Sequence, residues 1–236
     1  MTFDVPKHAR GDAGRIGVSP AVIFDMDGVL IDSSPAHLKS WQATAARDGL
    51  TITQEQFNDF CGVTSRDIIR AVWKRDMSDE EVRALDDAKE ETYRRIVQDR
   101  FPIMPGAVEL IRALHEAGIG VAIGSAGSLE NVSQTIDRLA VAPYLDAVVH
   151  GGEILRGKPD PEVFLLAAKR MNRMPRDCVV VEDAKGGVAA AKAAGMTCIG
   201  FKSAGHTDAD YVRADRVILS LAEIEPRTIL ELLDCR

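Results

Sequence analysis

The sequence predicts an α/β fold in which a doubly wound, Rossmann-like parallel sheet carries a second, all-helical domain inserted after the first strand. Short apolar runs occur without alternating polar residues, which is typical of strands that are buried on both faces of a parallel sheet. Helical spacing separates these runs, and strands that alternate with helices predict βαβ units. Roughly 95 residues, 25–119, lie between the first two runs, whereas a βαβ unit needs only about 30.

The predicted strands are short apolar runs that end at polar residues or at glycine. They cover residues 21–24, 120–123, 147–149, 178–181, 197–200 and 216–219. Helical spacing predicts further elements over residues 107–117, 129–139, 162–171 and 187–194. Gly118 and Gly195 follow two of these helices, at the place where a glycine commonly ends a helix.

The inserted domain is predicted over residues 35–102, where the sequence is polar and charged and has no strand pattern. Its helical segments cover residues 36–48, 54–60, 66–74 and 79–98. We expect the charged run at 76–95 to form the solvent-exposed face of these helices. Residues 21–34 and 103–236 would then form the core, and residues 1–20 are expected to form a mobile N-terminal tail.

The composition argues against several classes of protein. Hydrophobic residues make up 46% and charged residues 28% of the 236 residues, which is typical of a globular chain. A net charge of −7 disfavours nucleic-acid binding, because that function needs an excess of Lys and Arg. The apolar stretches are far shorter than the roughly 20 residues that cross a bilayer, and the four cysteines are widely spaced, which indicates reduced thiols. We expect a cytoplasmic monomer that binds neither nucleic acid nor membrane.

Reactive side chains closely follow three of the predicted strands. Asp25 and Asp27 follow the first, Ser125 follows the second, and Glu182 and Asp183 follow the fourth. A doubly wound sheet binds its ligands at the carboxyl ends of its strands, so we expect these side chains to share one crevice. A single aspartate after a strand is often only a turn residue, but three strands that end in this way favour a functional site.

The residue types at these strand ends suit a metal ion and a phosphate. Asp25 and Asp183 offer the oxygen ligands that Mg²⁺ prefers. The loop that begins Ser125-Ala126 offers a hydroxyl and backbone N–H groups ahead of a predicted helix, which suits a phosphate group. Lys158 precedes another predicted helix and is suited to neutralise charge on the same phosphate.

This arrangement predicts phosphoryl transfer to a carboxylate. Asp25 would be the nucleophile, and Asp27 would be the general acid and base. Other catalytic templates fit poorly, because the sequence has no P-loop, no G-x-S-x-G nucleophile elbow and no G-x-G-x-x-G after a strand.

These motifs resemble those of the haloacid dehalogenase superfamily, in the branch of phosphatases and β-phosphoglucomutases with a helical cap. The resemblance covers residues 21 to about 217. The four motifs correspond to residues 25–29 (DMDGV), Ser125, Lys158 within GKPDPEVF, and Glu182-Asp183. The resemblance implies that Asp25 forms an aspartyl phosphate and that the inserted helices are a cap.

The resemblance also implies a ligand set for Mg²⁺. Members of the family hold the ion through the first-motif carboxylate, the backbone carbonyl of the second aspartate and an acidic residue of the fourth motif. These positions correspond to Asp25, Asp27 and Asp183, with Glu182 as a further ligand or a neighbour of the ligands. The haloacid dehalogenases themselves lack the second aspartate, which is present here as Asp27, so a dehalogenase is disfavoured.

The cap sequence carries further similarities. His37 and Trp41 resemble an H-x-x-x-W motif of the phosphoglucomutase-like branch, and Lys89 and Tyr93 resemble its K-x-x-x-Y motif. We expect His37, Arg66 and Lys89 to contact the substrate, whereas Trp41 is expected to pack in the cap. Arg66 lies one position later than the arginine of mutase-type caps.

We therefore predict a Mg²⁺-dependent phosphohydrolase of small phosphorylated metabolites such as sugar phosphates. A β-phosphoglucomutase-like phosphomutase is the alternative enzyme, and the displaced Arg66 argues against it. A non-catalytic metabolite-binding module is a further alternative, because a fold does not dictate a function. The presence of both Asp25 and Asp27 argues against that module.

Overall fold

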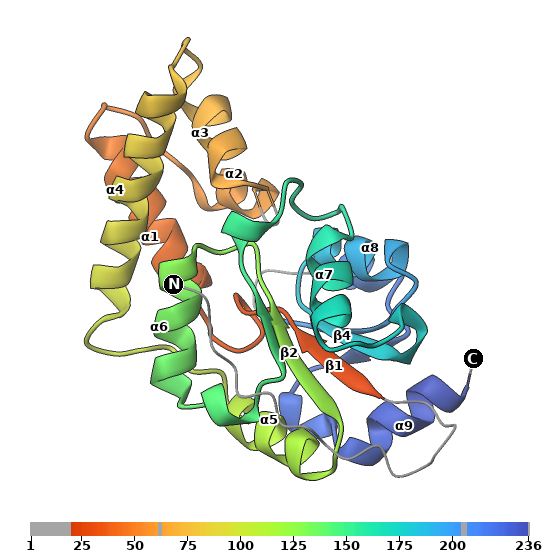
Figure 1. Ribbon diagram of the computed structural model, residues 1–236. Helices are drawn as coiled ribbons and strands as arrows, with labels where there is room; N and C mark the ends of the chain where they lie inside the picture. The colour runs from red at the N-terminus through yellow and green to blue at the C-terminus, as the bar shows by residue number, and fades with distance from the viewer. Residues whose placement is uncertain (1–19, 61–62, 204–206, 236) are drawn as a thin grey trace.

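The computed structural model describes residues 20–60, 63–203 and 207–235, and at its centre is a six-stranded sheet (Figure 1). The strands are β1 (Ala21–Phe24), β2 (Gly120–Gly124), β3 (Ala147–Val149), β4 (Cys178–Glu182), β5 (Thr197–Phe201) and β6 (Arg216–Ile218). Neighbouring strands are parallel, in the order β3-β2-β1-β4-β5-β6. The predicted parallel sheet is confirmed, whereas the predicted tail at residues 1–20 lies outside the described residues except for Pro20.

Helices cover both faces of this sheet. Helices α5, α6 and α9 pack on one face, and α7 and α8 pack on the other. The α-helices of the described residues are α1 (Ser34–Ala46), α2 (Gln54–Asp59), α3 (Ser65–Trp73), α4 (Asp79–Val97), α5 (Ala107–Glu116), α6 (Leu129–Leu139), α7 (Glu162–Arg170), α8 (Lys185–Ala193) and α9 (Pro226–Asp234). Short 3-10 helices are η1 (Ala142–Tyr144), η2 (Gly151–Glu153), η3 (Pro175–Asp177), η4 (Asp208–Tyr211) and η5 (Leu221–Glu223).

The central strand β1 shows why the strands have unbroken apolar sequences. Val22 and Phe24 join the cluster beneath α5, α6 and α9, whereas Ala21 and Ile23 join the cluster beneath α7 and α8. All four side chains are fully buried. Because both faces of the sheet are covered, every residue of such a strand is apolar and no alternation appears.

Some helix boundaries differ from the predicted ones. Helix α1 begins at Ser34 rather than at residue 36, because Pro35 lies in the first turn, where its missing N–H breaks no helical hydrogen bond. Helix α8 begins at Lys185 rather than at residue 187, and two glycines lie in its first turn. Helix α9 was not predicted, and its buried face is small, with Thr228 and Ile229 as its buried residues.

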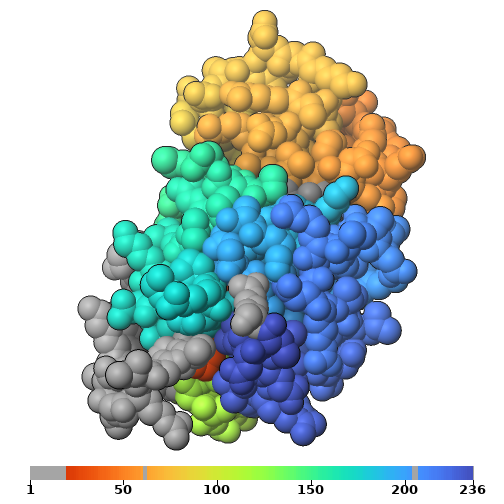
Figure 2. Space-filling view, turned by 90° about the vertical axis from the view of Figure 1, so that its right-hand side faces the viewer, coloured from red at the N-terminus to blue at the C-terminus, as the bar shows by residue number. Residues whose placement is uncertain are grey.

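The four helices predicted for residues 35–102 are all present, and they gather at one end of the molecule (Figures 1 and 2). Their apolar side chains form a cluster separate from those of the sheet, made of Trp41, Ala45, Ile52, Phe57, Ile68, Ile69, Trp73 and Val82. The division of the chain into a core and a cap at residues 35 and 102 stays a prediction. Among the described helices, none has the length and apolar character that a membrane span requires.

Candidate active site

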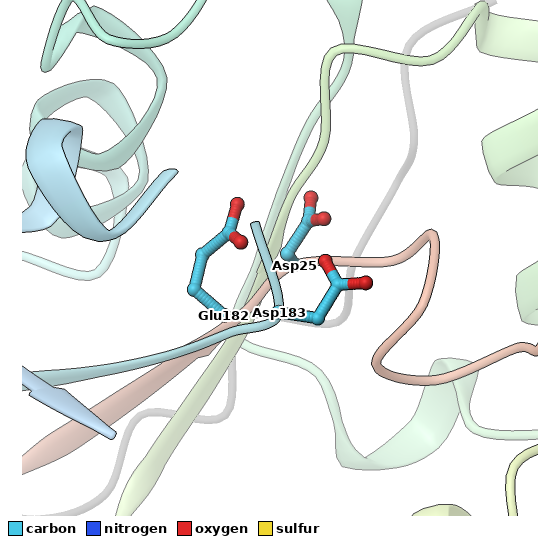
Figure 3. A group of neighbouring side chains, drawn as sticks. All are labelled: Asp25, Glu182 and Asp183. Atoms are coloured by element: carbon cyan, nitrogen blue, oxygen red, sulfur yellow. The ribbon is translucent and has the colours of Figure 1, made fainter. Parts of the chain in front are cut away.

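Three acidic side chains meet where β1 and β4 end (Figure 3). These strands are neighbours, with Phe24 in register with Val181, so Asp25 lies beside Glu182 and Asp183. The three residues are 7%, 0% and 7% exposed, and one carboxylate oxygen from each lies within 4.8 Å of the others. The structure thus brings together three of the residues that the strand ends predicted.

Lys158 contacts two of these carboxylates. Its Nζ lies 2.7 Å from Asp25 Oδ1, 2.5 Å from Glu182 Oε1 and 4.9 Å from the centre of the Phe164 ring. Burial by itself lowers the pKa of this lysine, but the two carboxylates outweigh burial and raise the pKa above its usual value. The ammonium is therefore a fixed positive charge beside Asp25. The peptide bond between Lys158 and Pro159 is cis.

Both carboxylate oxygens of Glu182 are engaged by the protein. Oε1 accepts a hydrogen bond from Lys158, and Oε2 accepts one from the backbone N–H of Ala184 at 2.7 Å. The side chain lies against the first turn of α8, where a Cβ on Gly187 would be 1.7 Å from Oε1. These contacts suit a residue that holds Lys158 in place better than one that ligates a metal directly.

Asp183 is held by residues that follow β5. Ser203 Oγ donates to Asp183 Oδ2 at 2.9 Å, and the Tyr211 hydroxyl donates to the Asp183 backbone carbonyl at 2.7 Å. On the other side, a Cβ on Gly28 would lie 1.8 Å from Asp183 Oδ2, and Gly28 has a φ of +81°. The turn after β1 therefore requires glycine both for its backbone conformation and for the space that Asp183 fills.

Asp27 is held by residues at the start of α1, and it is not part of the acidic cluster of Asp25, Glu182 and Asp183. Its Oδ1 accepts from Ser33 Oγ at 2.6 Å and lies 3.1 Å from His37 Nε2. Burial alone would raise the pKa of Asp27, but the hydrogen bonds with His37 and Ser33 outweigh burial and lower that pKa. The pKa of Asp25 is raised by burial, despite Lys158, and by its acidic neighbours. Two carboxyls that lie two residues apart therefore have opposite pKa shifts.

A buried lysine of α4 contacts His37. Lys89 Nζ lies 2.9 Å from His37 Nδ1 and 2.6 Å from Glu90 Oε1, and it lies over the rings of Trp41 and Tyr93 at 5.1 and 5.6 Å. Tyr93 also stacks on the His37 ring, with the centroids 4.0 Å apart. Lys89 is only 3% exposed, so the prediction that the charged run at residues 76–95 faces solvent is wrong at Lys89. The expected packing of Trp41 in the helical region is confirmed.

The loop after β2 lies beside Asp27. Ser125 is buried, and its Oγ accepts a hydrogen bond from the N–H of Gly127 at 2.9 Å, whereas Ala126 is exposed. A Cβ on Gly127 would lie 3.1 Å from Ser125 Oγ and 3.6 Å from Asp27 Oδ2. The N–H of Gly151 donates to the Gly127 carbonyl at 2.7 Å and supports the loop from its other side. The predicted phosphate loop and the predicted acid/base residue are therefore neighbours.

Arg66 is not brought into this group. It lies at the exposed start of α3, and within the described ranges its side chain makes no hydrogen bond or ion pair. The buried residues of this helix are Ile68, Ile69 and Trp73, and their spacing turns Arg66 outward. Substrate contact by Arg66 stays a prediction.

Ser33 shows what sequence reasoning missed. It occupies the N-cap position of α1, where serine is common because its hydroxyl usually bonds the helix N-terminus. Here no such bond forms, because the hydroxyl donates to Asp27 instead. Serine at a helix start therefore carried no signal that could have revealed this role. Glu90 and Asn131, which hydrogen bond to each other, were missed for a similar reason, since surface helices commonly carry such residues.

The donor set fits a hard divalent cation such as Mg²⁺. The buried group contains only oxygen donors, from Asp25, Glu182 and Asp183, and Mg²⁺ prefers such donors. Lys158 balances at most one of these three negative charges. The pKa of Asp25 and that of Glu182 are both raised, first by burial and also by neighbouring carboxylates, so a bound cation would relieve a repulsion already present.

Comparisons with known proteins agree with this geometry. A family model described as haloacid dehalogenase-like hydrolase matches residues 20–195. Phosphorylated carbohydrates phosphatase from Thermotoga maritima is 31% identical over 180 residues, which cover 75% of this chain and 82% of the relative. Hexitol phosphatase A from Escherichia coli is 34% identical over 212 residues, which cover 88% of this chain and 92% of the relative.

A solved structure has the same fold as this chain. β-Phosphoglucomutase from Clostridium difficile superposes with a TM-score of 0.82 over 91% of this chain and 96% of that chain. The two chains are 24% identical, so this likeness concerns the fold alone. The family match extends over most of the chain and includes the strand-end residues described above. The chain therefore belongs to the haloacid dehalogenase-like hydrolase family.

Proposed function

We propose that the protein is a Mg²⁺-dependent phosphohydrolase of small phosphorylated metabolites, which acts through an aspartyl phosphate on Asp25. The observation that carries this proposal is the contact of Lys158 Nζ with Asp25 Oδ1 at 2.7 Å, inside a buried group of carboxylates. An ammonium at this place attracts a phosphate to the atom that would attack it. Asp27 is held apart from that group by α1, which suits a separate acid/base role.

Asp25 and Asp183 would hold Mg²⁺ through their carboxylates, and Asp27 would hold it through its backbone carbonyl. When bound, the ion neutralises charge on the phosphoryl group during transfer. Glu182 would act next to the ion, because both of its oxygens already bond to Lys158 and to a backbone N–H.

The proposed reaction has two steps. In the first, a carboxylate oxygen of Asp25 attacks phosphorus, and the bond from phosphorus to the leaving oxygen breaks. The leaving oxygen keeps the electron pair and takes a proton from Asp27. In the second step, water attacks the same phosphorus and gives a proton to Asp27, and the bond from phosphorus to Asp25 breaks. Ser125, the backbone at Ala126 and Lys158 would bind the remaining phosphate oxygens in both steps.

A sugar phosphate is the substrate class that we propose. The support comes from relatives whose names specify phosphorylated carbohydrates and hexitols. The helices of the proposed cap bring His37 to Asp27 and Lys89 to His37. Both residues would therefore act near the leaving group, and closure of the cap would exclude water. Hydrolysis is favoured over phosphate isomerisation because a mutase must hold a second phosphate firmly, and Arg66 is exposed and has no hydrogen bond or ion pair with any residue that the structure describes.

The test is a product analysis with several phosphate esters, with and without Mg²⁺. We expect Mg²⁺-dependent release of inorganic phosphate from p-nitrophenyl phosphate and from hexose phosphates. The Asp25→Asn variant should lack this activity while it keeps the circular dichroism spectrum of the wild type, because the amide has nearly the same shape but is not a nucleophile. A faster appearance of an isomerised sugar phosphate would replace the hydrolase with a mutase. No turnover of any ester would favour a non-catalytic binding module.

A further inference from the structure

A chain of polar contacts joins α4 to α6 close to the candidate active site. Glu90 Oε1 accepts from Lys89 Nζ at 2.6 Å, and Glu90 Oε2 accepts from Asn131 Nδ2 at 2.5 Å. Arg94, one turn further along α4, donates to Asn131 Oδ1 at 3.3 Å. Asn131 is only 3% exposed, and the Glu90 side chain is 13% exposed, so these bonds are shielded from water.

Glu90 supplies the carboxylate that directly contacts the buried ammonium of Lys89. The other polar contact of that ammonium is His37 Nδ1 at 2.9 Å, and its remaining neighbours include aromatic rings. Burial alone would raise the pKa of Glu90, but Lys89 and His37 outweigh burial and lower that pKa. Glu90 is therefore an anion next to Lys89. Without it, a buried positive charge would lose its counter-ion, which is strongly unfavourable.

The ammonium also decides which nitrogen of His37 carries the proton. An ammonium can only donate hydrogen bonds, so His37 Nδ1 must accept from Lys89. In the neutral ring the proton then lies on Nε2, which is the atom 3.1 Å from Asp27 Oδ1. His37 therefore donates to Asp27 as long as Lys89 is directed at Nδ1.

Asn131 connects this chain to the loop at the end of β2. Its backbone N–H donates to Ser128 Oγ, where Ser128 is the N-cap of α6 and ends the loop that begins at Ser125. Its side chain meanwhile holds Glu90 of α4. One residue thus contacts both the proposed phosphate loop and the helix that carries Lys89.

We propose that Glu90 and Asn131 are positioning residues which, through Lys89 and His37, direct a hydrogen bond at Asp27. Their catalytic consequence rests on the proposed acid/base role of Asp27. Loss of either residue leaves Asp25 and its neighbours unchanged but frees Lys89 to turn away from His37. The Asp27 carboxyl then loses the hydrogen bond that orients it, so within the first step proton transfer to the leaving group suffers, whereas the alignment of Asp25 for attack does not.

Steady-state kinetics with two leaving groups tests this proposal. p-Nitrophenolate leaves readily without a proton, whereas the alkoxide of a hexose phosphate does not, and kcat/KM reports the step in which the leaving group departs. For Glu90→Gln and Asn131→Ala, we expect kcat/KM to fall by about tenfold or more with the hexose phosphate and by less than about threefold with p-nitrophenyl phosphate. An equal fall with both esters would indicate a merely structural effect and would overturn the proposal.

Arg138→Met is the matched control. Arg138 also lies on α6 and reaches the end of α4, where it donates to the Gln98 carbonyl at 2.8 Å, but it does not touch the chain from Asn131 to Asp27. We expect this variant to keep the wild-type kcat/KM for both esters. A leaving-group effect in Arg138→Met as large as that in Asn131→Ala would assign the effect to general contact between the helices, and the proposal would fail.

A second measurement does not depend on turnover. ¹⁵N spectra of histidine-labelled protein report which ring nitrogen is protonated, and the His37 signal can be assigned by its loss in His37→Gln. We expect the Nε2–H form in the wild type and in Arg138→Met, and a mixture of the two ring forms in Glu90→Gln and Asn131→Ala. An unchanged His37 signal in both of the latter variants would overturn the inference even if the phosphatase reaction were confirmed. If the wild type turns over no ester, only the proposed function is refuted, because the His37 spectra do not depend on turnover.

Discussion

Replacing Gly187 with alanine tests the position of Glu182, which holds Lys158 beside Asp25. Gly187 lies in the first turn of α8, and within a helix alanine is normally more favourable than glycine by about 1 kcal/mol. Here a Cβ would lie 1.7 Å from Glu182 Oε1 and 1.9 Å from its Cδ, so the carboxylate would have to move. We therefore expect the usual stabilising effect of this substitution to reverse.

The structure sets the size of the effect. Displacement of Glu182 breaks its contact with Lys158 at 2.5 Å and its bond from the Ala184 N–H at 2.7 Å. Breaking a buried ion pair costs about 3–5 kcal/mol, and the gain in helix propensity offsets about 1 kcal/mol of that. The expected net loss is about 2–4 kcal/mol of unfolding free energy, or a fall in Tm on the order of 10 °C for a chain of this length. Lys158 would also lose its alignment with Asp25, so activity should fall as well.

Urea unfolding followed by circular dichroism measures the stability, and p-nitrophenyl phosphate turnover well below Tm measures the activity. Gly186→Ala is the matched control, because it lies in the same turn and the neighbour that its Cβ would meet outside the helix backbone is Lys158 Cβ, at 4.0 Å. We expect Gly186→Ala to be at least as stable as the wild type. If Gly187→Ala equals this control in both measurements, Glu182 does not occupy the described position and the argument about Lys158 is wrong.

Three further predictions concern other parts of the molecule. Asp27→Asn should slow turnover of an unactivated phosphate ester by about 10²–10⁴-fold, the usual scale for loss of a general acid, and unchanged turnover would remove Asp27 from the mechanism. Burial raises the pKa of the Cys178 thiol to about 12, so mass spectrometry after brief iodoacetamide treatment of the native protein should find Cys178 unmodified and the exposed Cys235 alkylated. Hydrogen bonds from Arg170 lower the pKa of Glu153 in the folded state below its usual 4.5. Glu153→Gln should therefore lower the free energy of unfolding most above about pH 4.5, and this difference from the wild type should vanish as the pH falls through the lower pKa of the folded state. A stability difference between wild type and Glu153→Gln that grows in acid would contradict this reasoning.

The sequence alone determined the sheet and the residues at its edge. A strand buried on both faces needs apolar side chains at every position, so its pattern is visible without knowledge of its neighbours. The meeting of Asp25 with Asp183 could also be predicted, because parallel strands end at one edge of the sheet. The start of α8 and the presence of α9 could not, since glycines obscure the first helix and the second buries few side chains.

Only the tertiary structure decided which partner each polar side chain finds. Lys89 belongs to a charged run whose sequence predicts exposure, and it is buried because α4 packs on α1 and brings the ammonium over Trp41 and Tyr93. Glu90 and Asn131 are 41 positions apart, and they meet because the fold brings side chains of α4 within reach of α6. Helical periodicity shows which residues share a face of a helix. Which element packs on that face depends on how the whole helices are arranged, and local sequence patterns do not encode that arrangement.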